Sequence, residues 1–341
     1  MIECIFSIDY EIYGNGQGSL DELVYRPMEK LREVFDRRNA KIVNFIEVAE
    51  LQIIGAHNTD DAIGKVLKQI RELHLDGHEI DLHLHPQWYN AKRQNGQWEL
   101  DYSEYNLCLL PPSRIEEIVD TALAYIRKVL ADPDYTPPAF RAGNWLFQPT
   151  ERTAKVLSDR GIAIDSSVFK GGFQSANHLD YRKSQKNGYH WMFREDVNVP
   201  SEAGNMLEVP IHTELVPFWR MITTKRLGLQ KKSATAASKS RESSANKWSR
   251  FRDCARSRYP LKFDFCRMTF KEMRQMVENM RIQDAKTPRT YKPMVSIGHT
   301  KDLVEFKPID DFLSYLNDQG IRVATFKEIH EMCFQSPVAQ L

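Results

Sequence analysis

Short apolar runs alternate with amphipathic stretches along most of this chain. Runs of consecutive or alternating apolar residues are typical of strands, whereas apolar residues three and four apart are typical of helices. The predicted strands are residues 3–8, 41–48, 78–86, 138–142, 161–167, 293–299 and 320–326. The predicted helices are residues 27–39, 59–76, 113–131, 149–160, 268–280 and 308–319. This order of strand and helix, with short connections, predicts a parallel sheet covered by crossover helices.

Several predicted helix boundaries carry the usual start and stop residues. Pro27 stands at the start of one predicted helix, and Gly77 follows the end of another. Thr269 and Glu272 have the spacing of a capping box, which predicts a helix start there. A chain of 341 residues is long for one domain. The unbroken order of elements nevertheless favours a single β/α barrel with insertions, spanning residues 1–341, over two domains.

The composition is that of an ordinary globular protein, with 42% hydrophobic and 27% charged residues, and it excludes a fibrous or wholly disordered chain. No apolar stretch approaches the roughly 18 to 20 residues that span a bilayer, and the first residues lack the features of a signal peptide. The cysteines are scattered without a CxxC pair, which predicts free thiols in a reducing compartment: Cys4, Cys108, Cys254, Cys266 and Cys333. We therefore expect a cytoplasmic protein.

Basic residues gather in one segment, residues 225–262, although the whole chain has a net charge of only +1. The segment holds twelve Lys or Arg against Glu242 and Asp253, a net charge of +10, so the remaining residues sum to −9. Its middle is poor in large apolar groups, which predicts a solvated loop. One interpretation is an insertion between packed elements. The other is an arm that meets phosphate or an anionic membrane surface, because clustered cations attract anions.

Two pairs of residues with metal-binding side chains have the spacing of one strand face. Residues two apart in a strand project to the same side, so His83 and His85 can bind one divalent ion together. Asp9 and Glu11 repeat this spacing at the end of the first predicted strand, and in a parallel barrel both strand ends open on one face. Mixed carboxylate and imidazole ligands suit zinc acting as a Lewis acid. The alternative for each pair is an ordinary strand end with polar residues.

The order of several short motifs resembles the polysaccharide deacetylases, carbohydrate esterase family 4. The motifs extend across nearly the whole chain: GHEIDLHLHP at 77–86, FRAGNW at 140–145, GIAIDSS at 161–167, EVPIH at 208–212 and SIGHTKDL at 296–303. The resemblance implies a deformed (β/α)7 barrel with insertions, which holds one divalent metal ion, usually Zn²⁺, through one acid and two histidines. It also implies an enzyme that removes acetyl groups from N-acetylated sugars.

By this resemblance, Asp9 is the general base, and Glu11, His83 and His85 are the metal ligands. The chain departs from the usual family pattern in two places. One residue separates the two acids, as in the subset of relatives that read Asp-x-Asp or Asp-x-Glu. The histidine that precedes proline, His85, lies two residues after His83, whereas the family usually has four; the residue four positions on is Gln87.

The resemblance gives Arg141 the role of bracing the catalytic Asp. A planar guanidinium suits that role because it can bind a carboxylate through two hydrogen bonds and keep it ionised. Asn144 and Trp145 are expected to line the mouth of the barrel and bind substrate, where the Trp face can stack on a sugar ring. The alternative for Trp145 is packing in the core.

His299 matches the family histidine that protonates the departing amine, a task that suits an imidazole with a pKa near neutrality. Asp302 either orients His299 or forms a surface salt bridge. Asp165 is expected to help build the substrate groove, although an Asp that ends a strand is as often a helix cap. His212 ends a predicted strand and is expected to reach the substrate or a phosphate.

The predicted function is metal-dependent N-deacetylation of a sugar, an intracellular intermediate of surface-glycan biosynthesis that is linked to a nucleotide or a lipid. Segment 225–262 fits a phosphate-bearing carrier and a peripheral contact with the anionic inner face of the membrane, and we expect no nucleic-acid partner. Two rival functions remain. One is hydrolysis of another C–N bond, as in a cyclic imide or ureide, and the other is non-catalytic binding of a carbohydrate or an anionic lipid.

Overall fold

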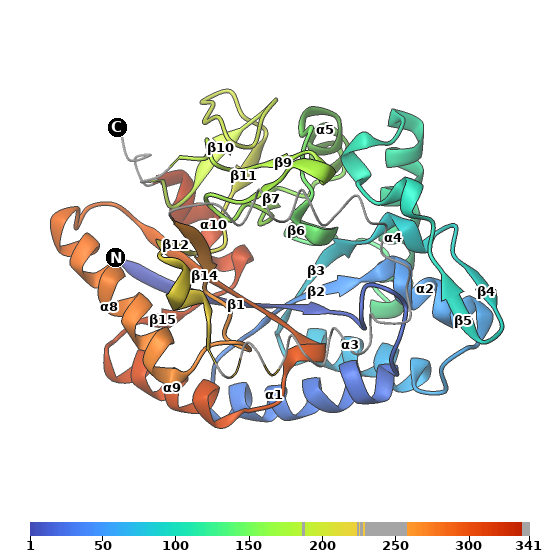
Figure 1. Cartoon of the computed structure of the whole chain (residues 1–341), viewed down its shortest axis with the longest axis horizontal. Helices are drawn as coiled ribbons and strands as arrows, with labels where there is room; N and C mark the ends of the chain where they lie inside the picture. Colours follow the sequence, from blue (N-terminus) through green and yellow to red (C-terminus); the bar gives the residue numbers. More distant parts are fainter. Residues whose placement is uncertain (186–187, 224, 226–227, 229–257, 336–341) are drawn as a thin grey trace.

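The computed structural model describes residues 1–185, 188–223, 225, 228 and 258–335. At its centre lies a curled, mainly parallel sheet with helices around it (Figure 1). Within the described residues the sheet has nine strands, in the order β10-β11-β7-β6-β3-β2-β1-β14, and β15 pairs with β1. They are β1 (Ile2–Tyr10), β2 (Val43–Glu47), β3 (Glu79–Leu84), β6 (Ala139–Ala142), β7 (Ile164–Asp165), β10 (Trp191–Phe193), β11 (Met206–Glu208), β14 (Lys292–His299) and β15 (Arg322–Val323).

Isolated β-bridges, rather than a continuous ladder of hydrogen bonds, connect the two edges of this sheet. Ile211, just beyond β11, bridges Val295 of β14, and Asp264 bridges Ile297. By contrast, β1 pairs with β14 along its length, from Ile2 opposite Lys292 to Asp9 opposite His299. The fold is therefore a deformed β/α barrel, as the sequence predicted. The predicted strands 161–167 and 320–326 are much shorter than expected, since only β7 and β15 form within them.

Helices cover the outside of the sheet: α1 (Arg26–Arg37), α2 (Val48–His57), α3 (Ile63–Leu75), α4 (Pro112–Leu130), α5 (Glu151–Asp159), α8 (Phe270–Lys286), α9 (Lys307–Asp318) and α10 (Phe326–Gln335). The predicted capping box is present, because the Thr269 hydroxyl accepts the Glu272 N–H and the Glu272 carboxylate accepts the Thr269 N–H. The prediction missed α2, whose apolar residues lie on several faces of the helix. It also began α3 too early, because Asp60 accepts the Ala62 N–H and holds a turn before the helix.

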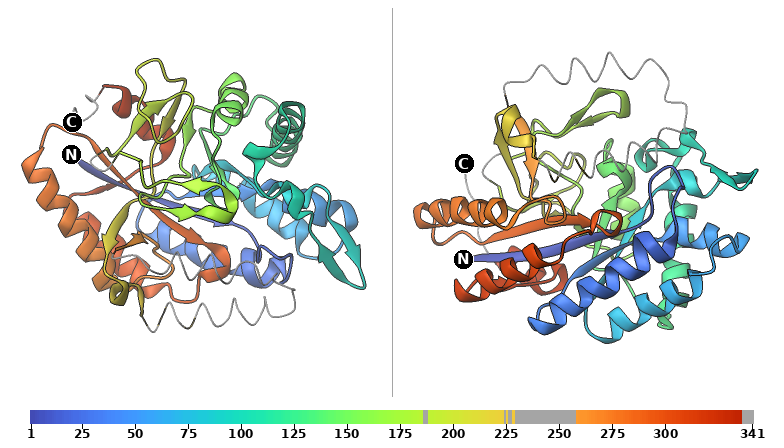
Figure 2. Two further views of the ribbon diagram at one scale, coloured as in Figure 1. Left: turned by 45° about the horizontal axis from the view of Figure 1, so that its top comes forward. Right: turned by 60° about the horizontal axis from the view of Figure 1, so that its bottom comes forward.

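Short two-stranded ribbons interrupt this order: β4 (Lys92–Gln94) with β5 (Gln97–Glu99), β8 (Phe173–Gln174) with β9 (Leu179–Asp180), and β12 (Thr213–Val216) with β13 (Tyr259–Lys262). In the right-hand view of Figure 2 the yellow-green and yellow ribbons lie above the strands, and the blue and red helices lie below. Single helical turns connect the elements: η1 (Asp21–Tyr25), η2 (Pro86–Trp88), η3 (Tyr102–Glu104), η4 (Leu107–Leu109), η5 (Gly143–Trp145), η6 (Ser175–Asn177), η7 (Phe218–Met221) and η8 (Thr300–Asp302).

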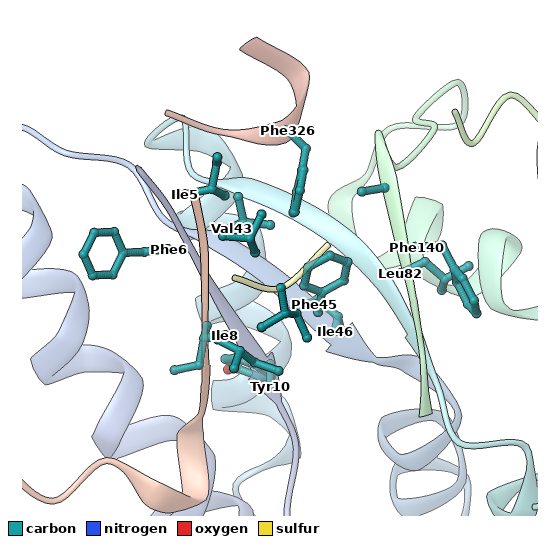
Figure 3. Close-up of a cluster of buried hydrophobic side chains, with 14 of the residues drawn as sticks. Ile5, Phe6, Ile8, Tyr10, Val43, Phe45, Ile46, Leu82, Phe140 and Phe326 are labelled. Atoms are coloured by element: carbon teal, nitrogen blue, oxygen red, sulfur yellow. The ribbon is translucent and has the colours of Figure 1, made fainter. Parts of the chain in front are cut away.

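Alternate side chains of the central strands face two different environments. Phe6 of β1 packs edge-on against Phe35 of α1, with 5.3 Å between the ring centroids. On the inner side, Phe45 of β2 packs against Phe326 of α10 at 5.8 Å. Figure 3 shows Phe6 and Phe326 on opposite sides of the strands. Because side chains alternate along a strand, the odd-numbered residues of β1 face the barrel interior.

Helix α10 closes the end of the barrel at which the strands begin. The Glu79 carboxylate, at the start of β3, accepts hydrogen bonds from the backbone N–H groups of Phe326 and Lys327 at 2.9 and 2.8 Å. A carboxylate is favourable there because a helix N-terminus carries partial positive charge. The polar residues of the candidate site lie at the opposite end, where the strands finish.

Most of segment 225–262 lies outside the described residues, so its predicted loop character stays a prediction. Its last residues form β13, which pairs with β12. Cys254 is also outside the described residues, whereas the other cysteines are buried free thiols: Cys4, Cys108, Cys266 and Cys333. None of the helices in the described part of the chain combines the length and the apolar character needed to cross a bilayer.

Candidate active site

The ends of β1 and β3 bring two carboxylates and two imidazoles to the mouth of the barrel. Asp9 and Glu11 lie two residues apart on the inner face of the chain as it leaves β1, and both are buried. His83 is on β3 and His85 directly follows it, also buried and with ring centroids 4.9 Å apart. The parallel pairing of β1, β2 and β3 places these strand ends on one side of the barrel, as expected.

Three of these residues converge on one point. Glu11 Oε2 lies 3.1 Å from His85 Nε2 and 3.8 Å from His83 Nε2. The ligand atoms of Glu11, His83 and His85 all lie within 4.8 Å of one another. Ligand atoms around a tetrahedral zinc ion stand about 3.3 Å apart, given bonds of about 2.0–2.1 Å. The predicted ligand set therefore fits a divalent metal ion.

The outer nitrogens of the two histidines support this fit. His83 Nδ1 lies 2.8 Å from the Arg141 carbonyl oxygen, so Nδ1 carries the proton and the Nε2 lone pair faces Glu11. His85 Nδ1 lies 3.1 Å from the Gln87 side-chain nitrogen, while Gln87 Oε1 is buried and has no hydrogen-bond partner among the described residues. In the flipped orientation of the Gln87 side-chain amide, this oxygen accepts a hydrogen bond from His85 Nδ1–H. With the proton on Nδ1, the Nε2 lone pair of His85 is available for a metal ion.

A second group, Asp9, Glu11 and His299, also has ligand atoms within 4.8 Å of one another. It is the weaker candidate, because the Glu11 oxygen nearest to His299 is Oε1, at 3.9 Å, and that oxygen already bonds Lys301. Glu11 belongs to both groups, and its Oε1 accepts a hydrogen bond from Lys301 Nζ at 2.7 Å. Burial raises the pKa of Glu11, but Lys301 and the two histidines outweigh this and hold it well below its usual range. The Glu11 side chain is therefore ionised at neutral pH.

Arg141 reaches Asp9 from β6, as the prediction required, but with one hydrogen bond instead of two. Its NH1 donates to Asp9 Oδ1 at 2.7 Å, while its NH2 donates to Ser7 Oγ at 2.8 Å and its Nε to the Ser166 carbonyl at 3.0 Å. The guanidinium also lies 4.0 Å from the Phe45 ring centroid. Burial raises the pKa of Asp9, yet Arg141 and the neighbouring histidines lower it overall. Asp9 is therefore kept ionised in a buried position.

His299 ends β14 and lies beside the carboxylate that the prediction made the base. Its Nε2 is 3.4 Å from Asp9 Oδ2 and 3.9 Å from Glu11 Oε1. Burial lowers the pKa of His299 to about 4, which differs from the near-neutral value expected from sequence. Asp302 is 3.8 Å from His299 Nδ1 and instead accepts two hydrogen bonds from Arg267, at 2.8 and 2.6 Å. Asp302 thus pairs with Arg267 and does not hydrogen-bond His299.

The turn after β6 carries Asn144 and Trp145 to the same mouth. A Cβ on Gly143 would lie 2.4 Å from the Leu84 carbonyl oxygen, so this close approach to β3 requires glycine. Asn144 and Trp145 both have left-handed backbone angles, with φ of 54° and 60°, which is unusual for tryptophan. The side-chain amide of Asn144 lies 3.3 Å from His85 Nδ1, and its oxygen rather than its nitrogen faces Nδ1 when Nδ1 carries the proton. Asn144 therefore contacts a candidate metal ligand.

Trp145 stands between His299 and a lysine that the sequence prediction did not single out. Its ring centroid is 6.1 Å from that of His299, and the two rings are nearly perpendicular. Lys262 Nζ lies 3.1 Å from the Trp145 ring centroid and 4.7 Å from that of Phe169. One face of the indole is therefore covered by an ammonium group, which leaves that face unavailable for the predicted stacking on a sugar.

The structure does not bring Asp165 and His212 into the cluster of ligand atoms. The Asp165 carboxylate accepts the Ser167 hydroxyl at 2.7 Å and the Ser167 N–H at 3.0 Å. It thus holds the turn after β7, and no helix of the described chain begins there for it to cap. His212 lines a separate cavity of about 400 Å³, together with residues of β12 and α8. Their predicted contact with substrate has no support in this placement.

Three residues near the cluster carried no predicted role. Lys301 follows His299 by two positions, the same spacing that marked Asp9 and Glu11, and this was the signal that could have found it. Gln87 was noted only as an interruption of the histidine spacing, although it contacts His85. Lys262 was counted in the basic segment, but it alternates with Leu261 and Phe263 as a strand residue would.

No family model and no curated protein matches the sequence. Solved structures resemble the fold. A proposed polysaccharide deacetylase from Mycobacterium smegmatis covers 100% of this chain and 93% of its own, with 13% identity and a TM-score of 0.53. A 4-alpha-glucanotransferase from Thermococcus litoralis covers 99% of this chain and 39% of its own, with 12% identity and a TM-score of 0.52.

A branching enzyme of glycoside hydrolase family 57 from Thermococcus kodakaraensis is similar to the same degree, with 12% identity and a TM-score of 0.52 over 96% of this chain and 70% of its own. These comparisons place the chain in the curled α/β fold that polysaccharide deacetylases adopt, as predicted. The same fold also occurs in a 4-alpha-glucanotransferase and in a branching enzyme, so the fold alone does not decide the reaction.

Proposed function

We propose that this chain is a metal-dependent hydrolase that removes an acetyl group from an N-acetylated sugar. The observation that carries the proposal is the convergence of Glu11, His83 and His85 beside an ionised Asp9 that Arg141 holds. One acid and two histidines leave an open position on a metal ion, which is the arrangement of a catalytic rather than a structural site. Such an ion would supply Lewis-acid polarisation of the amide carbonyl.

The residues around the ligands have the chemistry that amide hydrolysis needs. Asp9 accepts a proton from the attacking water, and Arg141 keeps it ionised until then. A C–O bond forms to the acetyl carbon, and the C–N bond breaks as the nitrogen gains a proton. His299 Nε2, 3.4 Å from Asp9 Oδ2, is placed to pass the proton from Asp9 to the departing amine. The proton lost by water is thus the one gained by the amine.

For the natural substrate, we propose an amino-sugar intermediate linked to a nucleotide or a lipid. The net charge of +10 in segment 225–262 supports a phosphate-bearing carrier and a peripheral contact with an anionic membrane. Replacing the Lys and Arg residues of 225–241 by Gln tests this. Unchanged activity on a pyrophosphate-linked sugar, together with unchanged binding to anionic vesicles, would make the segment a simple insertion.

The reaction itself is tested with zinc-loaded full-length protein. We expect acetate and a free amine from N-acetylglucosamine oligomers, and no release from the Asp9→Asn variant, which retains all three proposed ligands. Asp134→Asn, which changes an exposed carboxylate, is the matched control and retains activity. The same preparations are assayed with a cyclic imide, a ureide and an α-glucan. Turnover of one of these in place of the N-acetylated sugar would reassign the reaction. Sugar binding without stoichiometric metal would favour a binding protein.

A further inference from the structure

Four cationic side chains lie around the mouth, and they differ in their partners. Arg141 bonds Asp9 at 2.7 Å, Lys301 bonds Glu11 at 2.7 Å, and Arg267 bonds Asp302 at 2.6 Å. Lys262 is the exception, because its side chain makes no hydrogen bond or ion pair with any residue that the structure describes; its ammonium lies against the rings of Trp145 and Phe169. Lys262 is half-buried, and a partly desolvated cation without a carboxylate partner calls for a functional explanation.

Strand alternation directs Lys262 toward the mouth. The segment that follows β13 runs beside β14, where the Phe265 N–H donates to the Ile297 carbonyl and Asp264 bridges Ile297. Phe263 and Phe265 point outward, since Phe263 packs against Phe312 of α9 at 5.7 Å and Phe265 packs against Phe6 at 5.4 Å. Lys262 has the opposite parity and therefore projects to the inner side, where Trp145 and Phe169 lie.

The nearest acidic residue in sequence does not serve as the missing partner. Asp264 Oδ1 accepts hydrogen bonds from the Cys266 and Arg267 backbone N–H groups, each at 3.1 Å. Its Oδ2 lies 3.5 Å from the Arg267 side chain. Asp264 is thus committed to its own turn and to Arg267. The ammonium of Lys262 is left with aromatic faces, which attract a cation but do not neutralise it.

Lys262 is also close to the reacting groups without belonging to them. It contacts Trp145, Trp145 contacts His299 edge-on at 6.1 Å, and His299 lies 3.4 Å from Asp9. Burial is the main reason that the pKa of Lys262 falls to about 7, and an anion placed against it would restore the charge. The indole N–H of Trp145 is buried in the same cluster and has no acceptor among the described residues.

We propose that Lys262 binds an anionic oxygen group, a carboxylate or a phosphate, that the substrate carries beside its N-acetyl group. The inference rests on the proposed function, because it takes the acetamide to lie at Glu11, His83 and His85. It goes further by assigning a charged substrate and a specificity residue. A single ammonium suits either anion, since it acts as a point charge and does not impose the paired geometry of a guanidinium.

The test uses zinc-loaded full-length protein and three matched probes: methyl N-acetylglucosaminide, the corresponding N-acetylglucosaminuronate, and N-acetylglucosamine 1-phosphate. The measured quantity is the ratio of kcat/KM for each anionic probe to that for the neutral one. We expect Lys262→Met to lower this ratio about ten- to hundredfold, which is the worth of a hydrogen bond to a charged group. Lys262→Arg should retain most of the ratio. Lys155→Met, which removes an exposed positive charge on α5, is the matched control.

A separate binding experiment distinguishes failure of this inference from failure of the proposed function. The same probes are titrated calorimetrically into zinc-loaded Asp9→Asn and into Asp9→Asn with Lys262→Met. Loss of the anionic preference in the second protein supports the assignment of Lys262 even if no probe is deacetylated. A ratio that stays within about twofold in both arms, or no binding of either anionic probe, overturns it while leaving turnover of the neutral sugar as a separate result. Which anionic probe shows the larger loss identifies the carboxylate or the phosphate.

Discussion

The two sides of the barrel mouth are built by different means. On one side, the long parallel strands β1, β3 and β14 fix Asp9, His83 and His299 through continuous register. On the other side, Trp145 and Lys262 come from a single turn after β6 and from the short strand β13. Regular pairing determines where a strand residue points, whereas the second side depends on a left-handed turn and on contacts between rings.

The charges are balanced differently on the two sides. On the side built by β1, β3 and β14, which we call the strand side, Arg141 and Lys301 each bond a buried carboxylate. These buried charges are therefore paired with one another. On the side built by Trp145 and Lys262, the turn side, the Lys262 ammonium lies against aromatic rings and forms no ion pair with a described residue. Paired charges keep a catalytic geometry in place before the substrate arrives. An unpaired cation is costly in the free protein and becomes favourable only when a ligand supplies the anion. The strand side is therefore suited to chemistry and the turn side to selection of the substrate.

The largest effect should follow from breaking the strand side at a metal ligand. We expect His83→Ala to lower deacetylation at least ~10³-fold, since loss of even an outer contact to a ligand costs about 10- to 100-fold. Bound zinc, measured by elemental analysis after dialysis, should fall from about one per chain to a small fraction. The matched control is His57→Ala, an exposed histidine on α2, which should keep both properties. Full zinc occupancy in His83→Ala would assign the metal to the group of Asp9, Glu11 and His299 instead.

A smaller effect should follow from breaking one of these charge pairs. Arg141→Met leaves Asp9 buried without its partner, and we expect a loss of about 3–5 kcal/mol in unfolding free energy at neutral pH. Arg141 holds the folded-state pKa of Asp9 below its usual value, so this contribution is present above the unfolded pKa of about 3.9 and is lost as pH falls further. Urea unfolding of metal-free protein at pH 7.5 and at pH 2.5, well below the unfolded pKa, measures it. A difference between the two proteins that does not shrink at pH 2.5 would contradict the pairing.

This contrast also explains how far sequence reasoning could go. The strand side was predictable, because spacing of two in a strand places Asp9 with Glu11 and His83 with His85. The order of strand and helix then predicted that these ends meet on one face, and the ligand atoms do converge. Reading helices and strands from the spacing of apolar residues did not predict α2, whose apolar residues form no single stripe. It also overestimated the lengths of β7 and β15.

The turn side was not predictable from spacing. Trp145 owes its position to a left-handed turn that Gly143 permits by its close approach to β3, and no periodicity encodes such a turn. Lys262 lies 117 positions after Trp145 in the sequence, at the end of a segment that looks uniformly basic. Only the tertiary fold shows that this lysine faces the mouth. Asp165 ends β7 as predicted, whereas His212 directly precedes β12 instead of ending a strand, and both face other surroundings.

The smallest effect should come from removing the unpaired cation. The folded-state pKa of Lys262 is about 7, below the value of about 10.4 for a free lysine, so the unfolded chain binds the additional proton between these values. The wild type should therefore gain stability as pH rises from 7 to 10, and burial should cost it most below pH 7. We expect Lys262→Met to be more stable than the wild type by only about 1 kcal/mol at pH 6.5, because water reaches the half-buried ammonium and screens most of the penalty, while methionine keeps the aromatic contact without the charge.

The decisive feature of this last prediction is its dependence on pH and on ligand. The stability difference, measured by urea unfolding, should be largely lost by pH 10, where the folded-state lysine is neutral and only the unfolded chain still binds the proton. It should reverse when N-acetylglucosamine 1-phosphate is present at saturating concentration, because only the wild type gains the ion pair. Lys155→Met, at an exposed pair on α5, should show neither change. A Lys262→Met protein that is less stable than the wild type at every pH would mean that the ammonium is a structural part of the aromatic cluster, and the contrast between the two sides of the mouth would then be lost.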